Sequence, residues 1–189
     1  MNQHFVLHKP PGVLSQFKYE GKRKSRKRLL GDLYDFPEGT MAIGRLDENS
    51  EGLLLLTTDG KMSEYVRSSQ VEKEYLVQVA GIINQEAIDV IQKGVLIGTK
   101  TGKYLTKPCK ASLIDNIEEY LIEPRFVREA RHGPLSWASI TLTEGKYKQV
   151  RKMTAAVGYP TLRLIRVRIG TINLDLNIGE VKKVNNLRV

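Results

Sequence analysis

The pattern of apolar and polar positions divides the chain into short strands with a few helices between them. The strand-like runs end at glycine, proline or Asp-Gly turns, as strands of a sheet commonly do. They cover residues 5–7, 41–44, 53–57, 73–81, 137–142 and 162–174, and several more strands are expected between residues 95 and 123. Apolar residues at helical spacing predict three helices, over residues 61–68, 85–93 and 146–157.

The order of these elements indicates the fold class. Strands and helices alternate irregularly, without the repeated strand and helix pairs of a doubly wound parallel sheet. A mixed, mostly antiparallel α+β fold is therefore expected. The 189 residues have room for one compact domain or two small, coupled lobes. We expect a single domain over residues 1–189, with lobes of approximately residues 1–70 and 71–189.

The charge of the chain points to a polyanionic partner. Lysine and arginine exceed aspartate and glutamate by 30 to 21, for a net charge of +9. Such an excess favours nucleic acid first. Seven basic residues and one acid lie between Lys18 and Arg28. This run fits either a solvated loop or an arm that follows phosphates, and the overall charge favours the arm.

The number of cysteines and the hydropathy of the chain argue against a disulfide-stabilised protein, a cysteine metal site and a membrane-spanning protein. The single cysteine, Cys109, leaves no intramolecular disulfide and no cluster of cysteine metal ligands, which suits a reducing cytosol. No apolar run is long enough to cross a membrane. The three histidines lack metal-ligand spacing and no glycine-rich phosphate loop occurs, so neither a metal nor a nucleotide cofactor is predicted. We expect a cytoplasmic protein without a membrane segment.

The stretch GRLDENSEGLLLLTTDG, residues 44–60, places Asp47 on irregular backbone between two apolar strands. The end of a rigid sheet is a common place for functional residues. A carboxylate that a cation or hydrogen-bond donor keeps ionised can act there as a nucleophile, whereas a carboxylate in a turn can merely cap the backbone. From this aspartate alone, capping is the commoner outcome and both roles stay open.

A second cluster, EGKYKQVRKMTAAVG at residues 144–158, predicts a helix with a basic face beside an apolar one. It fits an ordinary solvated surface helix. Alternatively, Arg151 turns inward to pair with a carboxylate while the lysines meet phosphate. In the strand that follows, alternation puts arginines on both faces, which is unusual for a half-buried strand.

Together with KEYLVQVAG at residues 73–81, these motifs resemble the three signature regions of the ribosomal RNA pseudouridine synthases, in the subfamily typified by the small-subunit synthase A. The order and spacing of the motifs match, and the resemblance covers nearly the whole chain. KPPGVLSQF and PTLRLIRVRIG resemble most the members that act on the large subunit, whose RNA is 23S ribosomal RNA. The resemblance implies the pseudouridine synthase fold, with a mixed sheet across two lobes and a central basic cleft.

The resemblance also implies an isomerase that detaches uracil from ribose, rotates it and rejoins it through a ring carbon, without cofactor or metal. By matching positions, Asp47 would be the catalytic nucleophile, acting on the anomeric carbon or stabilising the intermediate. Tyr75 would stack on the flipped uracil and could transfer a proton. Arg151 would pair with Asp47, and Leu164 would close the apolar floor beneath the base. Without the family context, Tyr75 fits plain core packing.

Many relatives carry an RNA-binding domain of ribosomal protein S4 type before the catalytic domain. We expect none here, because the catalytic motifs begin by Lys9. Other residues must then hold the RNA. The expected set is Arg45, Lys146, Lys148, Lys152 and Arg166, with the arm residues Lys22, Arg23, Lys24, Arg26, Lys27 and Arg28. The expected partner is 23S ribosomal RNA, bound by a monomer.

Two rival hypotheses remain open. A non-catalytic ribosomal RNA-binding or ribosome-assembly protein would use the same basic surface but would not need Asp47. A hydrolase of nucleoside bonds could also use an aspartate beside a ribose, but it would release free uracil.

Overall fold

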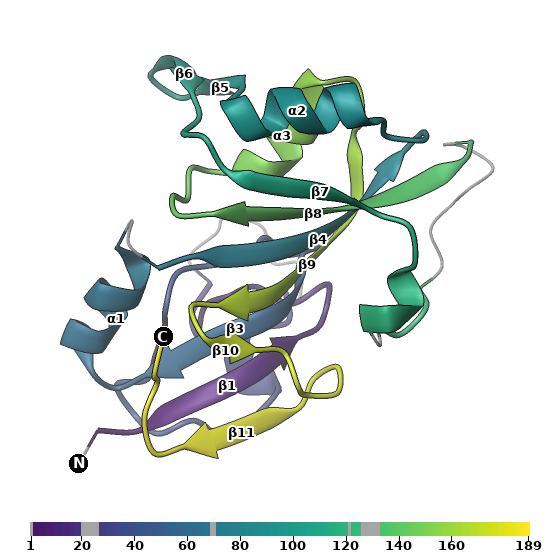
Figure 1. Cartoon of the computed structure of the whole chain (residues 1–189). Coiled ribbons are helices and arrows are strands. Elements are labelled where there is room, and N and C mark those ends of the chain that lie inside the picture. Colours follow the sequence, from purple (N-terminus) through teal and green to yellow (C-terminus); the bar gives the residue numbers. More distant parts are fainter. Residues whose placement is uncertain (1, 20–26, 69–70, 121, 126–132) are drawn as a thin grey trace. The chain divides into compact units, whose positions relative to one another are not determined.

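The computed structural model describes residues 2–19, 27–68, 71–120, 122–125 and 133–189. The chain forms two compact units (Figure 1). Unit 1 comprises Met1–Lys73 and Ile165–Val189, and unit 2 comprises Glu74–Leu164. The sequence placed all of residues 71–189 in the second lobe, whereas the structure groups the C-terminal residues with unit 1. The reason is strand pairing, since two C-terminal strands join the N-terminal sheet.

Unit 1 is built on a sheet in which β1 lies between β11 and β3. Its strands are β1 (His4–Lys9), β2 (Met41–Ala42), β3 (Glu51–Thr57), β10 (Ile172–Asn173) and β11 (Val181–Val184). β9 (Thr161–Ile169) starts in unit 2, and its later residues pair in parallel with β3. The helix α1 (Gly60–Arg67) contacts β3, and a 3₁₀ helix covers Leu30–Asp32. The other pairings of this sheet are antiparallel.

The four leucines of β3 are fully buried because both faces of the strand are covered. Leu53 and Leu55 point to one side, where Val66 of α1 packs in the same cluster. Leu54 and Leu56 point to the other side, into a cluster with residues from the segment between β1 and β2. Burial on both faces explains the continuous apolar run, and each buried leucine contributes about 2 kcal/mol. The strand that follows the Asp47 loop is therefore firmly anchored.

Unit 2 has a sheet in which β8 lies between β4 and β7, and a separate hairpin of β5 and β6. Its strands are β4 (Lys73–Ala80), β5 (Leu96–Thr99), β6 (Gly102–Leu105), β7 (Lys110–Ile114) and β8 (Leu135–Leu142). Its helices are α2 (Gln85–Lys93) and α3 (Gln149–Ala156), with a 3₁₀ turn at Ile117–Tyr120. The predicted mixed, mostly antiparallel α+β fold is confirmed.

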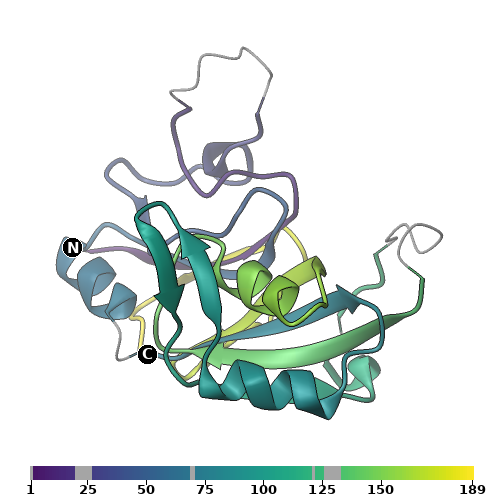
Figure 2. The same ribbon diagram turned by 90° about the horizontal axis from the view of Figure 1, so that it is seen from above.

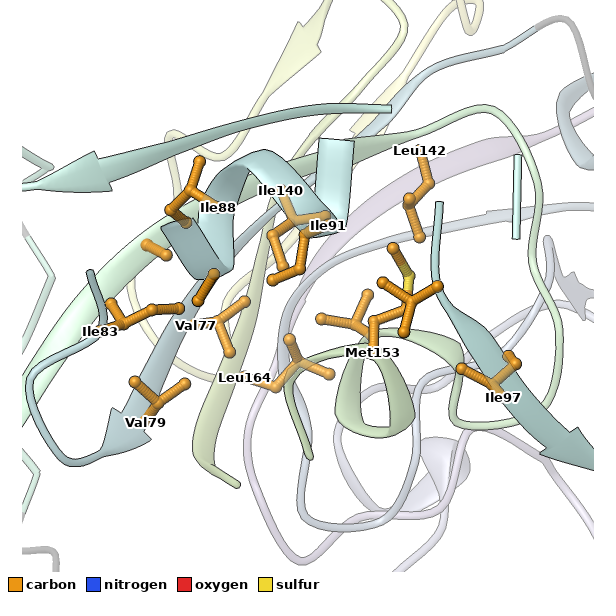
Figure 3. Packing of buried hydrophobic residues seen from close by; sticks show 14 residues of the cluster. Val77, Val79, Ile83, Ile88, Ile91, Ile97, Ile140, Leu142, Met153 and Leu164 are labelled. Atoms are coloured by element: carbon orange, nitrogen blue, oxygen red, sulfur yellow. The ribbon is translucent and has the colours of Figure 1, made fainter. Parts of the chain in front are cut away.

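The core of unit 2 joins both helices to the sheet (Figure 3). Ile88 and Ile91 of α2 and Met153 of α3 meet Val77 and Val79 of β4. All five side chains are buried, with exposed fractions of 0%. This packing fixes α3, the helix that carries the predicted Arg151.

No helix in the described part of the chain is long and apolar enough to span a membrane.

Two predicted elements differ from the structure. The helix predicted over 146–157 begins three residues later, because Lys148 adopts a left-handed conformation (φ 52°) and the Lys146 N–H donates to the Gln149 side chain. The strand predicted over 162–174 turns at Gly170 (φ 55°) and continues as β10. The other two helices lie within one residue of their predicted bounds, and Asn84 caps α2 as its position suggested.

Candidate active site

Asp47 lies in the loop between β2 and β3, and its side chain is half-buried. The loop closes as a turn, in which the Ser50 N–H donates to the Asp47 carbonyl at 3.0 Å. The nearby start of α1 is capped by a different acid, Asp59, whose carboxylate accepts from two backbone N–H groups. Asp47 therefore stands on irregular backbone at the end of a buried strand, as predicted.

The backbone on both sides of Asp47 is clamped by the segment KPPGVLS, residues 9–15. The Ser15 hydroxyl donates to the Leu46 carbonyl at 2.9 Å and accepts from the Leu46 N–H at 3.1 Å. On the other side, the Gly12 N–H donates to the Glu48 carbonyl at 2.7 Å. These hydrogen bonds restrict the backbone of Leu46 and Glu48, so they fix the position of Asp47 between them.

Lys9 completes this clamp as a buried ammonium with an exposed fraction of 0%. Its Nζ donates to the carbonyl oxygens of Pro10 at 2.8 Å, Val13 at 2.7 Å and Glu48 at 3.2 Å. An ammonium has three donors, and here each has one carbonyl acceptor. The desolvation cost of a buried charge is thereby offset by its hydrogen bonds.

Nearby carboxylates also favour the protonated, charged form of Lys9. Burial lowers the pKa of Lys9 to about 8, while Glu51, Glu48 and Asp47 act in the opposite direction. A pKa of about 8 leaves the ammonium mostly protonated at neutral pH. Lys9 is thus a buried positive charge within the electrostatic reach of Asp47.

The basic arm predicted to follow phosphates is only partly described. Lys22, Arg23, Lys24 and Arg26 lie outside the described residues. The Lys27 ammonium donates to both carboxylate oxygens of Glu48, at 2.8 and 3.0 Å. Its charge is therefore already paired within the protein, which weakens the predicted contact with RNA. Arg28 is exposed, and its carbonyl accepts from the Leu14 N–H.

Unit 2 contains three other predicted residues, of which Tyr75 and Leu164 share one apolar cluster. Tyr75 is half-buried at the start of β4 and packs against the unit 2 core, on the same face as Val77. Leu164 belongs to this core and is 6% exposed, which suits the predicted apolar floor. Arg151 lies on α3, and its Nη1 donates to the Thr161 carbonyl at 3.3 Å. The predicted pairing of Arg151 with Asp47 joins the two units and stays a prediction.

Of the arginines near Asp47 and along β9, Arg45 is exposed, whereas those of β9 are buried or bound within the protein. Arg45 is exposed, two residues before Asp47. Arg166 is 4% exposed and its Nε donates to the Leu53 carbonyl at 2.8 Å, which favours a role in holding β9 against β3 over the predicted RNA contact. Arg163 is also buried, and Arg168 contacts Glu72 at 3.2 Å. Burial and pairing explain how arginines occur on both faces of this strand.

The three predicted lysines of the basic helix face have different positions. Lys146 and Lys148 are exposed and precede α3, while Lys152 is half-buried within it. The predicted helical stripe therefore does not extend back to Lys146, because the helix starts only at Gln149.

Lys9 and Ser15 were missed as contributors to the site. Two consecutive prolines, which cannot donate backbone hydrogen bonds, marked residues 9–12 as a turn but gave no sign of what the turn holds. No cluster of histidine, cysteine, aspartate or glutamate that could hold a metal ion occurs among the described residues.

A half-buried carboxylate on a clamped loop, in a chain with a large excess of basic residues, suits an enzyme that works on a polyanion. The model of the family described as RNA pseudouridylate synthase matches residues 3–156. The chain belongs to this family, and it is an rRNA pseudouridine synthase, an isomerase.

Named relatives and a solved structure agree with this assignment. "Ribosomal large subunit pseudouridine synthase E" of Xanthomonas axonopodis pv. citri is 38% identical over 172 residues, which is 90% of this chain and 87% of that protein. The protein of the same name from Vibrio parahaemolyticus is 38% identical over 95% of this chain and 72% of its own length. A solved structure titled "Crystal structure of pseudouridylate synthase" superimposes with a TM-score of 0.76 at 28% identity, over 98% of this chain and 71% of that one.

Proposed function

We propose that this enzyme converts a uridine of 23S ribosomal RNA into pseudouridine, with Asp47 as the catalytic carboxylate. The clamp around the Asp47 loop is the observation that carries the proposal, because a nucleophile must be held in a fixed position to act. The names of the relatives, which specify the large ribosomal subunit, support the choice of RNA.

The proposed reaction exchanges one bond to ribose for another. The target uridine leaves its stack, since the bond to be broken is inaccessible inside a helix. Asp47 attacks the anomeric carbon, or stabilises the intermediate, as the bond from C1′ to N1 of uracil breaks. The base turns and C5 bonds to C1′, which releases the Asp47 carboxylate where it had bonded to that carbon. The C5 proton then leaves and N1 gains a proton. The product has the mass of the substrate.

The other predicted residues are given supporting roles in this proposal. Tyr75 offers an aromatic face for the flipped uracil, and its half-buried position on the apolar face of β4 suits that role. Leu164 is proposed to line the floor under the base. Arg151 is proposed to pair with Asp47 and keep it ionised when the RNA excludes water. One chain carries all four groups, so we propose that it acts as a monomer.

The test is to map pseudouridines in 23S ribosomal RNA from cells that lack this protein. Supplying the wild-type chain should restore one pseudouridine or very few, whereas Asp47→Asn should restore none. Asp115→Asn, which changes an exposed aspartate of unit 2, is the matched control and should restore modification. Release of free uracil would instead indicate a hydrolase, and full modification by Asp47→Asn would overturn the assignment.

A further inference from the structure

Unit 2 has a surface on which aromatic rings and lysines are interleaved. It lies where the β5–β6 hairpin stands beside α3 (Figure 2). The Lys152 ammonium of α3 donates to the Gly98 carbonyl of β5 at 2.6 Å and joins the two elements. We call this surface, made of Lys100, Lys103, Tyr104, Lys107, Lys146, Tyr147, Lys148 and Lys152, the platform.

Tyr147 is the most exposed large hydrophobic side chain among the described residues, with 65% of its surface exposed. The Nζ atoms of Lys148 and Lys152 lie 5.3 and 5.4 Å from the centre of its ring. The Nζ of Lys146 lies 4.6 Å from the centre of the Tyr104 ring. These are cation–π distances, so the rings are kept in place by ammonium groups while much of the Tyr147 ring stays open.

Glu144 fixes the platform from beneath. Its carboxylate accepts from the Tyr104 hydroxyl at 2.6 Å, from the Lys107 N–H at 2.9 Å and from the Gln149 side-chain amide at 2.6 Å. Burial alone would raise the pKa of Glu144, but these hydrogen bonds outweigh it and lower the pKa. The Glu144 carboxylate is therefore occupied within the protein, and residues 96–107 and 144–152 contain no other acid. The exposed lysines of these two segments are left to meet an external anion.

The backbone of the platform is strained at one residue. Among the described residues, Lys148 is the one non-glycine residue with positive φ, at 52°. Left-handed backbone is unfavourable for lysine, and such residues concentrate at functional sites. This conformation sets the direction of the chain just before α3, where Tyr147 is exposed.

The charge of the platform fits nucleic acid. The hairpin and its exit, residues 96–107, contain three lysines and no acid, and all three lysines are exposed. The segment 144–152 adds three lysines and Arg151 against Glu144. An open aromatic ring among ammonium groups is the arrangement that binds single-stranded RNA, because a base stacks on the ring and the phosphates on either side meet the lysines.

We propose that Tyr147 stacks against an unpaired nucleotide that flanks the target uridine, and that the platform lysines hold the adjoining phosphates. The inference rests on the proposed RNA substrate and adds to it a contact outside the reaction centre. A single-stranded partner is specified because the bases of a duplex are already stacked on one another and leave no face for Tyr147.

The experiment measures binding of a fluorescent single-stranded fragment of the RNA that the wild-type enzyme modifies. Tyr147→Ala should raise the dissociation constant about 5- to 100-fold, the usual range for a lost base–aromatic stack. Tyr147→Phe should bind within about twofold of wild type, because the ring remains. Tyr65→Ala, which removes an exposed ring from α1, is the matched control and should leave binding unchanged.

Salt dependence separates the two halves of the proposal. Tyr147→Ala should leave the slope of log K against log salt unchanged, because a ring releases no counterions. Lys148→Gln should reduce the slope by about 0.7, as for one lost phosphate contact on a single strand. Lys61→Gln, on exposed α1, should not change it.

Two failures can be told apart. If the wild type forms no pseudouridine, the proposed function fails, and the contact to a nucleotide that flanks the target uridine fails with it. If the wild type forms pseudouridine but Tyr147→Ala binds the fragment as tightly as Tyr147→Phe does, the platform proposal is wrong and the proposed function stands. Equal loss of affinity in Tyr147→Phe and Tyr147→Ala would also contradict stacking, since it would assign the effect to the hydroxyl.

Discussion

The Asp47 loop of unit 1 and the platform of unit 2 use the same kinds of residue in opposite ways. Beneath the loop, a lysine is fully buried and each donor of its ammonium meets a carbonyl oxygen. On the platform, the exposed Lys148 and the half-buried Lys152 lie beside an open ring. A buried lysine therefore fixes a position, whereas an exposed lysine offers charge to a partner.

The two regions should therefore fail in different ways. Substitutions in the clamp should lower the free energy of unfolding and disturb the position of Asp47, because buried backbone groups and a buried charge lose their hydrogen-bond partners. Damage on the platform should weaken RNA binding and change its salt dependence while leaving the fold intact. Three substitutions test this contrast.

Gly52→Ala should have the largest effect. Gly52 has a φ of 105° and pairs with Arg166, and an added Cβ would lie 2.7 Å from the Arg166 backbone N. The collision and the unfavourable φ together should reduce the free energy of unfolding by about 3 kcal/mol or more. Urea unfolding gives the value. Gly60→Ala, where the added carbon meets nothing, is the control.

Lys9→Met should have the next largest effect. It keeps most of the volume of the side chain but leaves the carbonyls of Pro10, Val13 and Glu48 without this donor. The free energy of unfolding should fall by roughly 2 to 4 kcal/mol, in the range for unsatisfied buried polar groups. Affinity for the single-stranded RNA fragment should change little when measured well below the unfolding midpoint.

The exposed Lys61→Met substitution controls for loss of a lysine as such, and it should change stability by about 0.5 kcal/mol at most. If Lys9→Met were as stable as Lys61→Met, the clamp would not hold the loop and the contrast between the regions would lose its basis.

Lys148→Gly should have the smallest effect, and of opposite sign. Glycine adopts the left-handed conformation of this position without steric cost, so the free energy of unfolding should rise by roughly 0.5 to 1 kcal/mol. Lys148→Ala removes the same ammonium but keeps the strain, and it should show no such gain. Both variants should weaken RNA binding alike. A gain in both would show that charge repulsion on the platform, and not backbone strain, is the cost at Lys148.

Much of the fold could be predicted from local sequence signals. A continuous apolar run found the strand around Leu53–Leu56, alternation found the strand around Tyr75, and Asn84 and Gly94 marked the two ends of α2 correctly. The start of α3 could not be found in this way. The start is displaced by the hydrogen bond that the Gln149 side chain accepts from the Lys146 N–H and by the left-handed backbone of Lys148, and periodicity records neither.

The site was only partly predictable. Asp47 was placed correctly at the end of a sheet strand and Tyr75 on an apolar face, because these features follow from alternation and turns. The apolar surroundings of Leu164 were implied only by the family resemblance, since alternation put Leu164 on the same face as two arginines. The clamp was not predictable, because Ser15 meets Leu46 across 31 positions of sequence. Arg166 and Lys27 were assigned to RNA from charge alone, and charge does not reveal an internal partner.

The most direct test of the central claim compares turnover and RNA affinity in the same preparation of Asp47→Asn. The substitution removes one carboxylate oxygen with little change in shape, so the clamp and the platform should both remain. We predict no detectable pseudouridine in the RNA fragment, with a dissociation constant and an unfolding midpoint close to wild type. Turnover near the wild-type rate would contradict the account, because it would show that the clamped aspartate does no chemistry.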